Sequence, residues 1–198
     1  MKIFILFALL FSFSVVAKEI SDFEIEGISI GDSLTDHFSY KEISNPQHIH
    51  EYKNIPFKYY LFKTNKSSIY EFIQVTVKSN NKYISSSKDM IIHAVNGLII
   101  SFNDIQECYS KMSMITKELE EYFNISAVED SGIRSNDPSG KSTYKRSLFY
   151  INNYQYSEAG VMCSDMSDAM SNLGKYDNLD VGIHSQEFIE QISLLEYK

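Results

Sequence analysis

The only two cysteines of this 198-residue chain, Cys108 and Cys163, lie in segments whose patterns predict how the fold is fastened. From Ile105 to Tyr122, apolar side chains recur at alternating steps of three and four residues, which places Cys108 on the buried stripe of a helix. Cys163 follows the inward-facing positions of an expected strand over residues 159–164. A disulfide would join helix to sheet and stabilise the fold by about 4 kcal/mol on the chain-entropy model. The alternative is two separate buried thiols.

The N-terminal segment has the three parts of an export signal. Lys2 supplies a positive charge, Ile3–Leu10 form an apolar run, and Val15–Ala17 have the modest side chains of a cleavage site. No second run of about 18 apolar residues follows that could act as a transmembrane anchor. The sequence predicts a signal peptide over residues 1–17 and one periplasmic or secreted α+β domain over residues 18–198. In such an oxidising compartment, two cysteines usually pair.

Composition excludes two classes of partner. The chain is 43% hydrophobic and 14% aromatic, enough to build a sizeable core, and its formal net charge is −8. An acidic surface without a cluster of Lys or Arg argues against nucleic acid and against anionic membranes as partners.

The segment 90–102 predicts a β-hairpin. Asn96 and Gly97, the pair favoured in type I′ turns, separate two β-rich runs. A helix over residues 104–123 follows directly, with a capping box that begins at Asn103. One face of the hairpin is apolar, and we expect this helix to cover it.

Weaker patterns outline the remaining chain. We expect a short helix from Asp32 or Ser33, loops over 44–55 and 126–141, strands over 57–63, 69–78, 142–151, 159–164 and 179–184, and a final helix capped by Ser185. Strand runs punctuated by helices predict an α+β fold. Its mainly antiparallel sheet would have six to seven strands, with two longer helices packed on one face.

Four side chains are candidates for site chemistry: His93, Asp165, Asp168 and His184. Asp165 and Asp168 belong to an acidic run that could bind calcium or supply paired carboxylates, although its spacing matches no calcium loop. Asp168 also fits a helix N-cap. His93 lies on the apolar hairpin face, where a histidine is usually a core residue, and His184 ends a strand.

Two further patterns favour structural interpretations. Gly140-Lys141-Ser142 resembles the end of a phosphate-binding loop, but Ser135 stands where that loop requires glycine, so we expect a turn. His48 and His50 lack an identifiable third metal ligand and are expected to be solvated. We predict no cofactor.

Four segments resemble exported proteins of low-GC marine alphaproteobacteria of the Pelagibacter type, a group without an assigned activity. They are residues 26–34 (EGISIGDSL), 137–142 (DPSGKS), 163–167 (CSDMS) and 185–188 (SQEF). The resemblance implies export. The opening Gly27-Ile28-Ser29 is similar to that of BamE-type envelope lipoproteins, which implies an envelope role, although this chain lacks their lipid-bearing cysteine.

The leading hypothesis is a soluble exported binding or envelope-accessory protein without catalysis, whose partner is an envelope protein or a small-molecule ligand. The alternative is a secreted hydrolase or metal-dependent enzyme that uses Asp165, Asp168 and His184, with residues 126–141 as a lid. A third possibility is interaction through the hairpin face, which burial of Leu98 and Ile100 would exclude.

Overall fold

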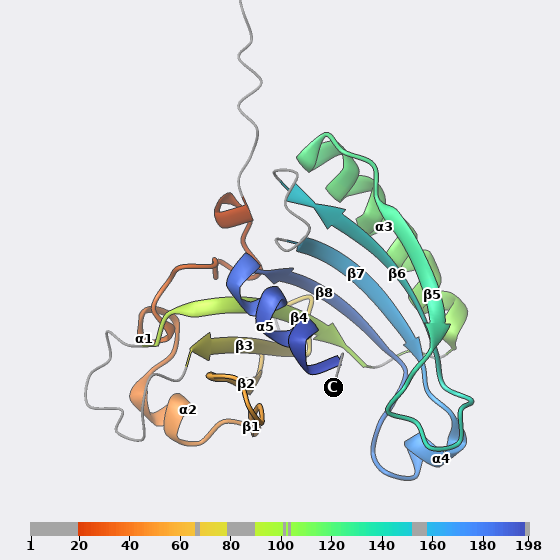
Figure 1. The fold of residues 1–198 in the computed structure, drawn as a ribbon, viewed down its shortest axis with the longest axis horizontal. Helices are drawn as coiled ribbons and strands as arrows, with labels where there is room; N and C mark the ends of the chain where they lie inside the picture. Colours follow the sequence, from red (N-terminus) through yellow and green to blue (C-terminus); the bar gives the residue numbers. More distant parts are fainter. Residues whose placement is uncertain are drawn as a thin grey trace, which may run out of the picture.

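The computed structural model describes residues 20–65, 68–78, 90–100, 102, 104–151 and 158–196. In these residues, one antiparallel sheet of eight strands combines with five α-helices and one short 3-10 helix (Figure 1). The elements in chain order are η1 (Ile20–Asp22), α1 (Leu34–His37), α2 (Tyr40–Ser44), β1 (His48–Glu51), β2 (Phe57–Lys63), β3 (Phe72–Lys78), β4 (Ile92–Ile99), α3 (Ile105–Phe123), β5 (Val128–Ile133), β6 (Thr143–Tyr150), β7 (Glu158–Asp165), α4 (Asp168–Ser171), β8 (Asn178–His184) and α5 (Gln186–Glu196). The α+β class is confirmed, but the sheet has eight strands where six to seven were expected.

The predicted signal peptide, residues 1–17, lies outside the described residues. Within the described part of the chain, no helix is long and apolar enough to cross a membrane.

Two four-stranded meanders build the sheet, in the order β1-β2-β3-β4-β8-β7-β6-β5. Strands β4 and β8 join the two meanders in the middle of the sheet, where Val95 lies opposite Ile183. Helix α3 follows the first meander and α5 follows the second. Because every neighbouring pair is antiparallel, short connections suffice within each meander.

One face of the sheet is apolar and is covered by α3. A row of buried cross-strand neighbours crosses this face: Val75, Val95, Ile183, Ala159 and Phe149. From α3, the buried side chains of Cys108, Met112 and Leu119 pack into the same core. The helical stripe seen in the sequence is therefore the face that makes the core.

Helix α5 packs on the opposite face, so the expectation that both long helices share one face is wrong (Figure 1). Its buried Phe188 packs with Phe57 and Ala94. Only Ser185 separates β8 from α5, and the Phe188 ring lies 5.9 Å from that of His184. This one-residue connection turns α5 onto the face to which His184 points. As predicted, Ser185 caps the helix, since its Oγ accepts a hydrogen bond from the Phe188 backbone N–H at 3.3 Å.

The predicted hairpin is wrong, because β4 runs unbroken through Asn96 and Gly97. Gly97 lies directly beneath the ring of Tyr70, where an added Cβ would come within 2.5 Å of the ring. Glycine is needed here because it leaves room for the Tyr70 ring, and not because the chain turns at this position. Asn96 is buried and bonded to β8, as described below.

Both segments predicted as loops contain an edge strand. Strand β1 lies within the expected loop 44–55, and all four of its residues are exposed. Strand β5 lies within the expected loop 126–141, and four of its six residues are exposed. Edge strands bury little, so neither sequence shows the apolar alternation by which strands are recognised.

Candidate functional site

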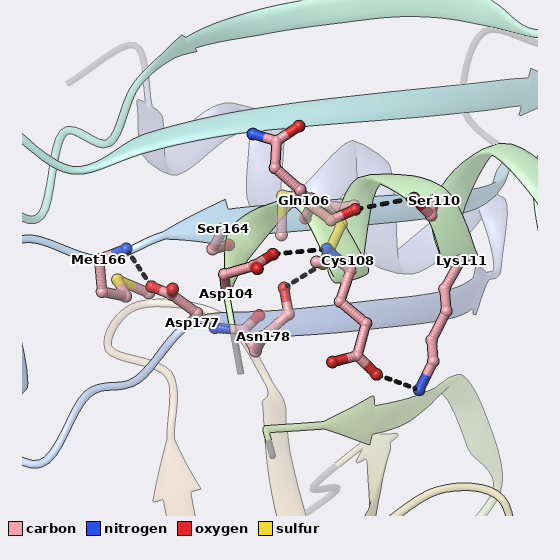
Figure 2. Close-up of a disulfide and its surroundings, with 12 residues drawn as sticks. Asp104, Gln106, Cys108, Ser110, Lys111, Ser164, Met166, Asp177 and Asn178 are labelled. Carbon is pink, nitrogen blue, oxygen red and sulfur yellow. Dashed lines mark hydrogen bonds and ion pairs between the residues drawn. A yellow bond between two sulfur atoms is a disulfide. The ribbon is translucent and has the colours of Figure 1, made fainter. Parts of the chain in front are cut away.

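The disulfide between Cys108 and Cys163 is present and ties α3 to β7, with Cα atoms 6.0 Å apart (Figure 2). Both cysteines are fully buried. Asp104 caps α3 by accepting a hydrogen bond from the Glu107 backbone N–H at 3.0 Å. The N-cap is therefore Asp104 rather than the predicted Asn103, which itself lies outside the described residues. The disulfide therefore lies on the α3 side of the sheet.

Next to α5, the second face of the sheet carries a cluster of polar side chains that we call the polar patch: Asn96, Glu158, Asp180 and His184. Asn96 Nδ2 donates to Asp180 Oδ1 at 2.7 Å and lies 3.3 Å from His184 Nε2. His184 Nδ1 lies 3.1 Å from Glu158 Oε1. Gly182 makes this possible, because a Cβ there would lie 2.4 Å from Asn96 Nδ2. The patch thus spans β4, β8 and β7 in one connected network.

Asp180 is the member of the polar patch that accepts the hydrogen bond from Asn96. Burial raises the pKa of its carboxyl group, and the Asn96 hydrogen bond and the charges of His184 and Arg134 only partly oppose this. Burial thus favours the neutral form of this carboxyl group.

His184 is the one candidate from the sequence that lies in this network, and its partners are not those expected. Asp165 is at the opposite end of the eight-residue β7 from Glu158, which corresponds to about 23 Å along the strand. Burial and the nearby Asp177 raise the pKa of Asp165. Asp168 is an exposed residue of α4, whose N-cap is Ser167 rather than Asp168. The structure therefore does not bring Asp165 and Asp168 together with His184.

His93 lies beneath α5 and not in the polar patch. Its ring centroid is 5.2 Å from that of Phe57, and its Nδ1 is 3.1 Å from Ser185 Oγ. Burial lowers the pKa of His93, and the charge of Glu187 partly opposes this shift. These contacts give His93 a role in seating α5 on the sheet.

The segment Gly140-Lys141-Ser142 is a turn, as predicted, and it is organised by Asp137. The buried Asp137 carboxylate accepts hydrogen bonds from the Ser142 and Ser139 backbone N–H groups, both at 2.8 Å. The hydroxyl groups of Ser142, Ser139 and Ser167 donate to it at 2.7–2.9 Å. These bonds, those from Ser142 above all, hold the pKa of Asp137 well below its usual range.

This turn makes stability depend on pH. Because the folded pKa of Asp137 lies below the unfolded value, its contribution is fully present above about pH 4 and is lost as the pH falls toward the folded pKa. The difference in unfolding free energy between wild type and Asp137→Asn should therefore be largest above pH 4 and shrink at lower pH, as measured by urea unfolding. Asp168→Asn removes an equal charge from an exposed position and serves as the control. A difference that grows on acidification would contradict this assignment.

Beside the polar patch, the same face is hollowed into a cavity of about 520 Å³, which we call the main cavity because its lining is largely apolar. A larger and more open hollow of about 670 Å³ adjoins it around Arg134, Tyr144, Arg146 and Met162. Its apolar lining is Leu61, Phe72, Leu98, Ile100, Met166 and Met170. Polar side chains from five segments surround this floor: Gln47, His48, Gln74, Arg134, Asn136, Lys175 and Asn178. Leu98 and Ile100 are half-buried and line this cavity, so they are neither fully buried nor fully exposed.

The histidines of β1 lie at the edge of the main cavity. His48 lines the cavity, and the His50 ring stacks on Tyr59 with centroids 5.2 Å apart. In the described part of the chain, no group of three His, Cys, Asp or Glu residues is placed to hold a metal ion. The cavity therefore offers aromatic, thioether and amide surface to a bound molecule.

Sequence reasoning missed most of this site. Glu158 and Asn96 reach His184 only through strand pairing across β7, β8 and β4, which no local pattern encodes. Arg134 follows a strand that was predicted as loop. No family model, curated protein or solved structure matches this chain.

Proposed function

We propose that the protein is an exported, periplasmic or secreted, binding protein without catalysis, and that a small molecule occupies the main cavity. The observation that carries this proposal is the cavity itself, a hollow of about 520 Å³ on the sheet face that α5 leaves open. Small-molecule sites typically have volumes of about 300–1,000 Å³, an apolar lining and a few convergent polar groups.

The construction of the cavity supports this use. Its floor consists of side chains of β2, β3 and β4, and cross-strand pairing fixes their relative positions, as for Phe72 opposite Leu98. Its rim comes from loops, including the Asp137-organised turn region that begins at Arg134 and the loop after α4 that contains Lys175. A rigid floor with an adaptable rim is the usual arrangement of binding sites.

The disulfide supports export. Paired cysteines are typical of extracytoplasmic compartments, and this pair lies in the core rather than at a surface where it could be redox-active. The resemblance to exported alphaproteobacterial proteins points to the same compartment. We include an envelope protein as a further partner, for which this resemblance is the only support.

An enzyme is the second candidate, and the polar patch is what favours it. The Glu158 carboxylate is positioned to orient the His184 imidazole, as a carboxylate does for a catalytic base. The described hydrogen bonds of His184 lead to Glu158 and Asn96, neither of which is a nucleophile. Stoichiometric metal in the purified protein, or hydrolysis that Glu158→Gln abolishes, would favour this candidate.

The binding proposal is tested by filling the main cavity. We expect members of a library of small aromatic and aliphatic acids, amides and alcohols to bind the mature protein, as measured by ligand-observed NMR and calorimetry. Leu98→Trp places a large side chain in the cavity and should weaken binding at least tenfold, equivalent to about 1.4 kcal/mol.

Leu173→Trp is the matched control, because Leu173 is 72% exposed and does not line the main cavity. It should bind the library as wild type does. Unchanged binding by a folded Leu98→Trp variant, or no binding by wild type to any library member, would refute the proposal.

A further inference from the structure

We infer that the molecule in the main cavity is a small organic acid, with a carboxylate attached to an apolar or aromatic body, and that Arg134 binds the carboxylate. This inference rests on the proposed function and names the ligand class for the same cavity.

The charge of the cavity lining is opposite to that of the protein. The chain has 26 acidic and 18 basic residues. Among the described residues that line the main cavity, Arg134 and Lys175 are cationic, and none is Asp or Glu. In an acidic protein, a cavity with two cations and no carboxylate attracts anions and disfavours cations.

Arg134 is a half-buried cation that forms no ion pair with a described residue. Nη1 donates to Ser164 Oγ at 2.5 Å and lies 3.9 Å from Met162 Sδ, while Nε lies 3.5 Å from Asn136 Oδ1. No carboxylate of the described chain lies within 4.0 Å of this guanidinium, and its described hydrogen bonds leave Nη2 unused. Burial lowers the pKa of Arg134, and the charges of Asp180 and Tyr144 only partly oppose this shift.

Arg146 provides the contrast on the same sheet face. Its Nη2 lies 2.7 Å from Asp130 Oδ2, so that guanidinium is paired within the described chain. Asp180 is the carboxylate whose charge acts on Arg134, but it forms no described ion pair with Arg134, and its Oδ1 accepts a hydrogen bond from Asn96 instead. In the described residues, Nη2 of Arg134 therefore remains available to a ligand.

The position of Arg134 fits a molecule with a charged end and an apolar body. Its Nη1 contacts Ser164 on β7, whose cross-strand neighbour Asn178 also lines the main cavity. The apolar floor of the cavity lies on the neighbouring strands β4 and β3, where Leu98 and Phe72 are cross-strand partners. If a ligand carboxylate binds Arg134, the apolar body of the same ligand would lie over this floor. A planar guanidinium can donate two parallel hydrogen bonds to a carboxylate, which a compact cation such as an ammonium group does not match.

Paired probes test the inference directly. We would titrate the mature protein with 3-phenylpropionate and its neutral amide, and with octanoate and its neutral amide, by calorimetry at low salt. Each acid should bind wild type at least tenfold more tightly than its amide, because charge-assisted hydrogen bonds are about twice as strong as neutral ones. Arg134→Gln should abolish this difference, while Arg134→Lys should keep part of it.

Lys141→Gln is the control for net charge, since Lys141 is exposed and lines no part of the main cavity. It should retain the full preference for acids. If the amides bind wild type as tightly as the acids, the inference is wrong while the cavity remains a binding site. If neither kind of probe binds, this inference and the proposed function both fail. Urea unfolding shows whether each variant is folded. If Arg134→Gln does not fold, the test is whether the preference for acids over amides is smaller in Arg134→Lys than in wild type.

Discussion

The double variant Cys108→Ala/Cys163→Ala is expected to lose about 4 kcal/mol of unfolding free energy. The disulfide closes a loop with a sequence separation of 55 residues, so its removal restores much conformational entropy to the unfolded chain. It also connects α3, which covers the apolar face, to β7 in the second meander. Urea unfolding of the oxidised wild type and of the double variant measures the difference.

Reduction provides the internal control for this prediction. Dithiothreitol should destabilise the wild type by a comparable amount and leave the double variant unchanged. A loss below about 1 kcal/mol in both experiments would show that the disulfide does not constrain the unfolded chain.

The second large effect is expected from Phe149→Ala, which should cost about 3–5 kcal/mol. Phe149 is fully buried in the row that crosses the apolar face, and its ring lies 5.9 Å from that of Phe123 at the end of α3. Removal of the ring leaves a cavity between sheet and helix that neighbouring side chains fill only in part. Thermal and urea unfolding both report the loss.

The adjacent variant Tyr150→Ala is the matched control. Tyr150 lies on the opposite face of the same strand and is 38% exposed. Its replacement should change stability by less than about 1 kcal/mol. Equal losses for the two variants would contradict the assignment of the apolar face to the α3 side.

The sequence predicted those elements whose burial imposes a strong period. Helix α3 is evident from its apolar stripe, and β2 and β8 from their alternation, because each presents one face to the core. The polar edge strands β1 and β5 bury too little to leave such a pattern. At Asn96-Gly97, the local sequence favours a turn, but tertiary packing places both residues inside strand β4.

The site was predicted less well than the fold, for a related physical reason. The disulfide could be predicted because each cysteine lies on a recognisable buried face. The His184 network depends on which strands become neighbours, and the position of Arg134 depends on a cavity that strands and loops form together. Neither property leaves a periodic signal in the chain.

The most direct test of the central claim, that the main cavity is the binding site, is to map 1H–15N chemical shifts during titration with 3-phenylpropionate. We predict that the largest changes occur at Gln74, Leu98 and Asn178, which line the main cavity on β3, β4 and β8. Changes centred on α3 and the opposite face of the sheet, or a spectrum unaltered by the acid, would contradict this account.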